Sequence, residues 1–203
     1  MSSQIDQVMR KTQAYWYEDG FVEMASGWVF LVVAALLAAE GLVPRDSAFV
    51  PIFQIGLPVL AVATGIPVAS LVMILKRHVT YPRTGFVRLH FDASRLRWMV
   101  AFVAFAAAVV IVLGGKWLDN VTAVGGLVMG AAFATIGLRV GALRFYVLAV
   151  WVSALGLSVG LMTTLAESWQ IAALMAGAAV ALIVSGLLAL RGYLLHNPPA
   201  QEA

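Results

Sequence analysis

The side chains best suited to chemistry gather in one polar stretch, residues 76–97 (KRHVTYPRTGFVRLHFDASRLR). It contains His78, His90 and Asp92, residue types that bind metal ions or transfer protons. His90 and Asp92 are two residues apart, however, and no third ligand stands at a suitable spacing. No glycine-rich phosphate loop of the Gly-x-x-x-x-Gly-Lys type occurs either. We therefore predict a non-enzymatic protein without catalytic, metal-binding or cofactor-binding residues.

Positive charge is the stronger signal of this stretch. Six Lys and Arg residues lie within it, and three more arginines border the later apolar runs. The nine candidate lipid- or partner-binding residues are Lys76, Arg77, Arg83, Arg88, Arg95, Arg97, Arg139, Arg144 and Arg191. At a membrane surface, each basic residue can hold anionic lipid headgroups with about 1 kcal/mol. The same residues could instead dock the acidic surface of another membrane protein subunit.

Two further roles for these cations stay open. They could pair within the chain and lock its N-terminal segment against the polar stretch. The acids available for such pairing are Asp6, Glu18, Asp19, Glu23 and Asp92. Alternatively, the charge could serve only to set the orientation of the chain in the membrane. We expect no nucleic-acid partner, because the cations would be held at a membrane surface.

The rest of the chain is apolar enough to place these residues at a membrane. Of 203 residues, 62% are hydrophobic and 11% are charged, and none is cysteine. Soluble domains are about half apolar and about a quarter charged. Without cysteine, disulfides and thiolate metal sites are excluded. Six apolar runs are long enough to cross a hydrocarbon core of about 30 Å. They are 24–43, 49–75, 98–115, 121–138, 145–166 and 169–190.

We therefore predict an all-α fold, a polytopic transmembrane bundle whose six spans form three antiparallel hairpins joined by short outer connections. The expected organisation is an N-terminal interfacial segment (1–23), spans one and two (24–75), a basic cytoplasmic loop (76–97), spans three to six (98–191) and a cytoplasmic tail (192–203).

The N-terminal segment has the spacing of an amphipathic helix over residues 4–19. Such a helix would lie on the membrane surface. Tyr15, Trp16 and Tyr17 are its expected interface anchors, because aromatic rings of this kind favour the headgroup level. The alternative is a solvated, partly disordered N-terminus.

Within the loop, apolar and polar residues alternate over 78–81 and again over 87–92. A period of two is typical of strands, and Pro82 and Gly85 between them suit a turn. We therefore predict a short β-hairpin in the cytoplasmic loop.

The second span carries two Gly-x-Pro elements, which end at Pro58 and Pro67. Each proline removes a helical hydrogen bond and predicts a kink. Kinked helices can form binding sites for transported molecules. Gly and Pro are also common in ordinary membrane helices, and no charged residue accompanies these two.

Glycines four residues apart occur twice, as Gly126 with Gly130 and as Gly156 with Gly160. This spacing lets helix backbones approach closely in lipid, so it predicts helix packing.

The basic residues also predict orientation. With six spans, eleven Lys and Arg residues fall on one side of the membrane, and only Arg45 and Lys116 fall on the other. The cytoplasmic side of a membrane protein carries the basic excess. Both termini should therefore be cytoplasmic.

Several segments resemble an uncharacterised family of small bacterial multi-span membrane proteins. The segments are Tyr15-Trp16-Tyr17-Glu18-Asp19-Gly20, Val79-Thr80-Tyr81-Pro82-Arg83-Thr84-Gly85, Arg144-Phe145-Tyr146 and Asn197-Pro198. The Thr-Tyr-Pro-Arg-Thr-Gly part is the most specific. The resemblance implies a bacterial inner-membrane setting and brings no known activity.

Taken together, these features predict a non-catalytic membrane protein that acts by binding, as an accessory or assembly subunit of a larger complex or as a sensor component. The alternative is a small transporter, or a carrier of lipid or another apolar molecule, that uses the proline-kinked second span. Ion-coupled carriers place ionisable groups at mid-membrane, and the predicted spans have none there.

Overall fold

The computed structural model describes residues 15–44, 47, 63–64, 67–84, 121–161 and 164–198. Its long helices are α2 (Phe21–Leu42), α6 (Val121–Val140), α7 (Leu143–Gly160) and α8 (Glu167–His196). A helical stretch from residue 67 continues into the π-helical turn η1 (Lys76–Thr80) and the short helix α4 (Tyr81–Thr84). The described part of the chain contains no strand, so the all-α prediction is confirmed there.

Four of these helices, α2, α6, α7 and α8, are long and apolar enough to cross a membrane. They correspond to the first, fourth, fifth and sixth predicted spans. The 30 residues of α8 extend over about 45 Å, more than a hydrocarbon core of about 30 Å requires. The second predicted span is described only in part and the third lies outside the described residues. The six-span count and its pairing into three hairpins therefore stay predictions.

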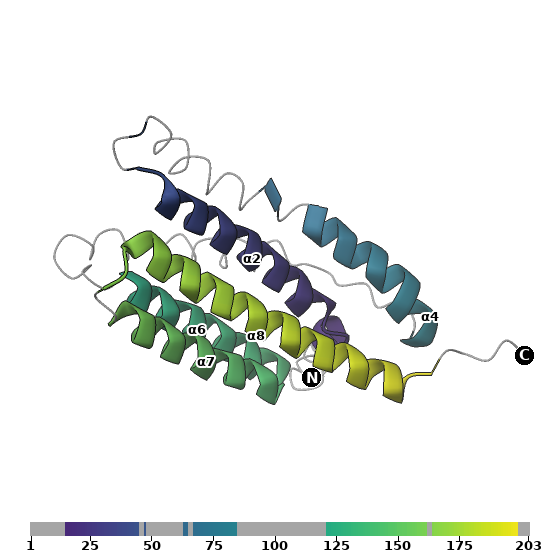
Figure 1. Ribbon diagram of the computed structural model, residues 1–203. Helices are drawn as coiled ribbons and strands as arrows, with labels where there is room; N and C mark the ends of the chain where they lie inside the picture. The colour runs from purple at the N-terminus through teal and green to yellow at the C-terminus, as the bar shows by residue number, and fades with distance from the viewer. Residues whose placement is uncertain are drawn as a thin grey trace, which may run out of the picture.

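Helix α8 lies between α2 on one side and the α6–α7 pair on the other (Figure 1). It runs antiparallel to α2, with Gly27 of α2 opposite Ala179 and Ile183, and Gly186 of α8 opposite Met24. A Cβ atom built on Gly27 would lie 2.7 Å from a side-chain carbon of Ile183. Glycine is therefore what allows these two backbones to come so close.

Helices α6 and α7 are joined by a two-residue turn and pack along a glycine seam. A Cβ atom on Gly126 would lie 2.6 Å from the Cα atom of Gly156, and one on Gly160 would lie 2.7 Å from the backbone of Ala123. The packing role predicted for the paired glycines is confirmed at both contacts. In the turn, Gly141 has a φ angle of 73°, a left-handed conformation that glycine adopts without strain.

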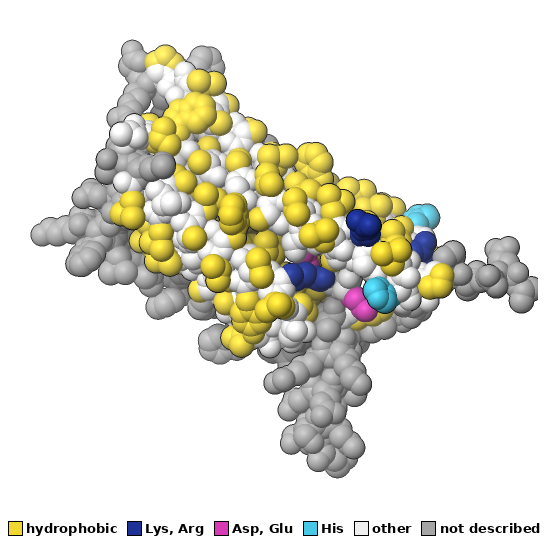
Figure 2. Space-filling view, turned by 60° about the horizontal axis from the view of Figure 1, so that its bottom comes forward, with side chains coloured by type: hydrophobic (Ala, Val, Ile, Leu, Met, Phe, Trp, Pro, Cys, Tyr) yellow, Lys and Arg dark blue, Asp and Glu magenta, His cyan; other side chains and the backbone are white. Residues whose placement is uncertain are grey.

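The interior between the helices is formed by two small clusters of apolar side chains. Phe145 and Leu148 pack with Leu182 in one cluster, and Val152 packs with Leu174 and Ala178 in the other. Large apolar side chains also cover much of the outer surface, where Figure 2 shows them spread along the bundle. Apolar residues inside and outside together are typical of helices surrounded by lipid.

The first arm of the predicted β-hairpin is wrong. Residues 78–81 are helical, within η1 and α4, and the predicted second arm at 87–92 lies outside the described residues. The alternation that suggested a strand spans only four residues, too few to distinguish it from the end of a helix. Pro82, which lacks an N–H group, is the second residue of α4, where a helix has no intrahelical acceptor for that donor. The backbone N–H of Tyr81 before it donates to the carbonyl oxygen of Lys76 in η1.

Candidate functional site

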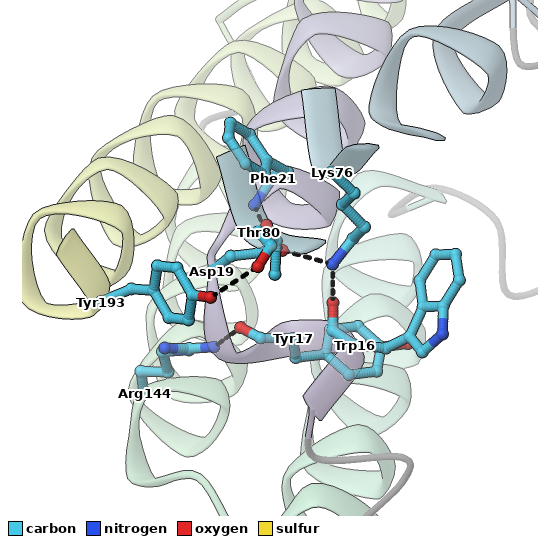
Figure 3. Close-up of polar contacts among 8 residues, drawn as sticks. All are labelled: Trp16, Tyr17, Asp19, Phe21, Lys76, Thr80, Arg144 and Tyr193. Atoms are coloured by element: carbon cyan, nitrogen blue, oxygen red, sulfur yellow. Dashed lines mark hydrogen bonds and ion pairs between the residues drawn. The ribbon is translucent and has the colours of Figure 1, made fainter. Parts of the chain in front are cut away.

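Polar side chains from five parts of the chain meet at one end of the bundle (Figure 3). We call this cluster the polar junction. Its members are Trp16, Tyr17, Asp19, Glu23, Lys76, Thr80, Arg144, Ser185 and Tyr193. They come from the segment preceding α2, from the first turn of α2, from η1, from the start of α7 and from the C-terminal part of α8.

Asp19 is the centre of the junction and is fully buried. Its Oδ2 atom accepts hydrogen bonds from Lys76 Nζ at 2.6 Å and from Thr80 Oγ1 at 2.8 Å. Its Oδ1 atom accepts a bond from the backbone N–H of Phe21 at 3.2 Å, at the start of α2. One carboxylate therefore satisfies the first backbone N–H of α2 and binds the helical stretch 67–84 to the start of that helix.

Local geometry explains how these groups meet. Val72, Lys76 and Thr80 are each four residues apart, so they share one face of their helix, and all three are buried. Gly20, directly after Asp19, has a φ angle of 70°. A Cβ atom there would collide with the carbonyl oxygen of Gly186 in α8. Glycine thus permits the sharp turn that points Asp19 at η1.

Lys76 is only 2% exposed, which is unusual for a lysine. In addition to its ion pair with Asp19, its Nζ atom donates to the carbonyl oxygen of Trp16 at 2.9 Å and lies 4.8 Å from the centre of the Trp16 ring. Burial lowers the pKa of Lys76, and the hydrogen bond and charge of Asp19 act in the opposite direction. The pairing therefore offsets part of the desolvation of the ammonium group.

A second ion pair joins α7 to α2. Arg144 Nε lies 2.8 Å from Glu23 Oε1, whose side chain is 1% exposed. Neither atom meets hydrogen-bond geometry in this pair, so the contact is mainly electrostatic. Ser185 of α8 donates to the other oxygen of Glu23 at 2.6 Å. The guanidinium of Arg144 also donates from Nη2 to the carbonyl oxygen of Tyr17.

Two tyrosines complete the junction. The ring of Tyr17 packs edge-on against Phe145, with 5.3 Å between the ring centres. Burial raises the pKa of Tyr17, the nearby Glu23 raises it further, and Arg139 lowers it. Tyr193 is buried and donates from its hydroxyl to the carbonyl oxygen of Thr80 at 3.3 Å. Through Tyr193, α8 also contacts the helical stretch 67–84.

The nine predicted lipid- or partner-binding residues fall into three groups: members of the polar junction, residues outside the junction, and residues that the structure does not describe. Lys76 and Arg144 lie in the polar junction and pair with carboxylates. Arg77, Arg139 and Arg191 are exposed and Arg83 is half-buried. Arg88, Arg95 and Arg97 lie outside the described residues.

The other predicted site residues lie as follows. Tyr15, Trp16 and Tyr17 are helical and half-buried, and the last two belong to the polar junction. Pro67 is exposed at the beginning of the helical stretch 67–84, and Pro58 lies outside the described residues.

The junction is arranged for holding helices together. Each of its two ion pairs connects residues far apart in sequence, and its carboxylates already bind cations of the same chain. Among the described residues, no three His, Asp or Glu side chains are grouped to hold a metal ion. Comparisons with protein families, with curated proteins and with solved structures find no match to this chain.

The sequence indicates Asp19 and Glu23 as possible internal partners of the cations, but it indicates no role for Thr80, Ser185 or Tyr193. A signal for Thr80 was present, since it belongs to the Thr-Tyr-Pro-Arg-Thr-Gly segment. Three of the four segments that carry the resemblance supply residues to the junction, through Asp19, Thr80 and Arg144. Ser185 stands within the sixth apolar run and Tyr193 at the start of the predicted tail, and nothing in the sequence indicates their partners.

Proposed function

We propose that this chain is a non-catalytic multi-pass protein of the bacterial inner membrane, with both termini in the cytoplasm. It acts by binding, as an accessory or assembly subunit of a larger membrane complex. The polar junction gives it a fixed shape, and its apolar flanks are the surfaces on which another subunit binds.

The observation that carries this proposal is the use of the charged groups. Asp19 and Glu23, the two buried carboxylates at this end, are held by Lys76 and Arg144 of the same chain. Groups engaged in this way stabilise the protein and are not free to receive a substrate proton or a transported ion. This favours a structural subunit over an enzyme or an ion-coupled carrier.

An apolar flank on α7 is the surface we propose for the partner subunit. Leu143, Val147, Val150 and Trp151 follow the spacing of one helix face and are 53–76% exposed. In lipid, close van der Waals packing drives the association of such faces.

The experiment is purification in mild detergent, followed by size analysis of the complex. Val150→Trp enlarges a side chain that is 70% exposed, and Leu188→Trp is the matched control on α8 at 63%. We expect V150W to dissociate a stoichiometric partner that L188W retains. A protein that purifies alone as a monomer and mediates solute or lipid flux in vesicles would contradict the proposal and favour the transporter with its kinks at Pro58 and Pro67.

A further inference from the structure

Positive charge remains at the junction end after the internal ion pairs are formed. Six described cations and three described carboxylates lie at this end. The cations are Lys76, Arg77, Arg83, Arg139, Arg144 and Arg191, and the carboxylates are Glu18, Asp19 and Glu23. Asp19 and Glu23 are taken up by Lys76 and Arg144. Within the described part of the chain, Glu18 is then the one carboxylate left at this end for four arginines, and its charge acts on Lys76.

Three of these arginines are exposed and come from three different helices. Arg77 belongs to η1, Arg139 to the last turn of α6, and Arg191 to the C-terminal part of α8. Contacts with the polar junction place the ends of η1, α7 and α8 together. The end of α6 joins them, because only two residues separate it from α7 and the charge of Arg139 acts on Tyr17. Figure 2 shows Lys and Arg side chains gathered toward one end of a face that is otherwise mostly apolar.

The position of these arginines along the helices matches the depth of lipid headgroups. Helix α8 exceeds the thickness of a hydrocarbon core by about 15 Å, using a rise of about 1.5 Å per residue. Arg191 lies in this excess, and Arg139 is one residue from the end of α6. A long arginine side chain at such a position reaches the phosphate level.

We infer that Arg77, Arg139 and Arg191 form a binding surface for phospholipids whose headgroup carries net negative charge. Arginine suits this partner because its planar fork can bind two phosphate oxygens at once. This assignment separates the exposed arginines from Lys76 and Arg144, whose charge is neutralised inside the protein. It goes beyond the proposed role as a subunit and does not depend on any protein partner.

The test uses the purified full-length chain in vesicles of phosphatidylglycerol and phosphatidylcholine. After extraction, native mass spectrometry gives the ratio of the two lipids that stay bound. We compare the triple variant R77Q/R139Q/R191Q with the control R45Q/K116Q, which removes charge from the predicted opposite side. Since each basic residue contributes about 1 kcal/mol near the surface, we expect the relative binding constant for phosphatidylglycerol to fall about fivefold per arginine.

The expected result is a loss of phosphatidylglycerol enrichment in the triple variant and an unchanged ratio in the control, with the thermal unfolding of all three proteins alike. An unchanged ratio in the triple variant, or an equal loss in the control, would overturn the assignment. Displacement of phosphatidylglycerol by an excess of inorganic phosphate would overturn it too, in favour of a general anion site. The experiment measures lipid composition, so the lipid-binding inference can fail or succeed independently of the proposed binding to a partner subunit.

Discussion

Asp19 contributes to the fold through three hydrogen bonds, and its buried carboxylate needs all three donors to offset the loss of water. Its carboxylate accepts bonds from Lys76, Thr80 and the backbone of Phe21 while fully buried. A buried carboxylate with fewer partners would keep most of its desolvation cost. The ion pair therefore adds little to the free energy of unfolding, whereas removing one of its two charges lowers that free energy strongly.

A double-mutant cycle on Asp19 and Lys76 tests this reasoning. Lys76→Met leaves a buried carboxylate without its counter-ion, and we expect a loss of about 3 to 5 kcal/mol in the free energy of unfolding. Asp19→Asn should cost a similar amount, because it leaves a buried ammonium group unpaired. The double variant D19N/K76M should recover a large part of either loss. The measurement is reversible unfolding in mixed micelles, and additive losses would show that the two residues do not interact.

The charged residues of the junction could be found from the sequence, but their pairing could not. The acids and cations near the apolar runs identified Asp19, Glu23, Lys76 and Arg144 as possible partners, since buried charges must be paired. Several pairings were possible, because the chain has nineteen other Lys, Arg, Asp and Glu residues and the sequence does not restrict any of them to one contact. The fold decides between them, because it places the segment preceding α2 against η1 and so brings Asp19 to Lys76.

At the scale of elements, apolar runs and glycine spacing were sufficient to predict most of what is described. Four of the predicted spans correspond to α2, α6, α7 and α8, with ends that differ by a few residues. The structure pairs α2 with α8 most extensively and α6 with α7. Hydropathy could not predict this arrangement, because every face of a lipid-exposed helix is apolar. The helical conformation of 78–81 was missed for a different reason, since a strand-like alternation over four residues carries little information.

The glycine seam between α6 and α7 gives the prediction at this scale. Gly156→Ala places a Cβ atom 2.6 Å from the Cα atom of Gly126, so the helices must separate. We expect a loss of about 1 to 3 kcal/mol in the free energy of unfolding, as for other overpacked sites. Gly192→Ala is the matched control, because no atom lies within 4 Å of its added carbon. That variant should be neutral or gain up to about 1 kcal/mol from helix propensity. Equal effects of both variants would contradict the role of the seam.

The whole molecule has one polar end, and we expect that end to face a single side of the membrane. The polar junction and the exposed arginines lie at that end, and the positive-inside rule predicts that it faces the cytoplasm. Arg45 and Lys116, the two cations predicted on the other side, lie outside the described residues. The orientation therefore comes from the sequence, and the grouping of the cations comes from the fold.

Cysteine labelling tests this claim most directly, because the natural chain has no cysteine. His78 and His196 are exposed, and each ring hydrogen-bonds a carbonyl group of its own helix rather than a member of the polar junction, so we expect H78C and H196C to leave the junction intact. The K116C variant reports on the other side. In spheroplasts, an impermeant maleimide should label K116C and leave H78C and H196C unlabelled until the membrane is broken. Labelling of H78C or H196C from outside, or of the two from opposite sides, would contradict the account.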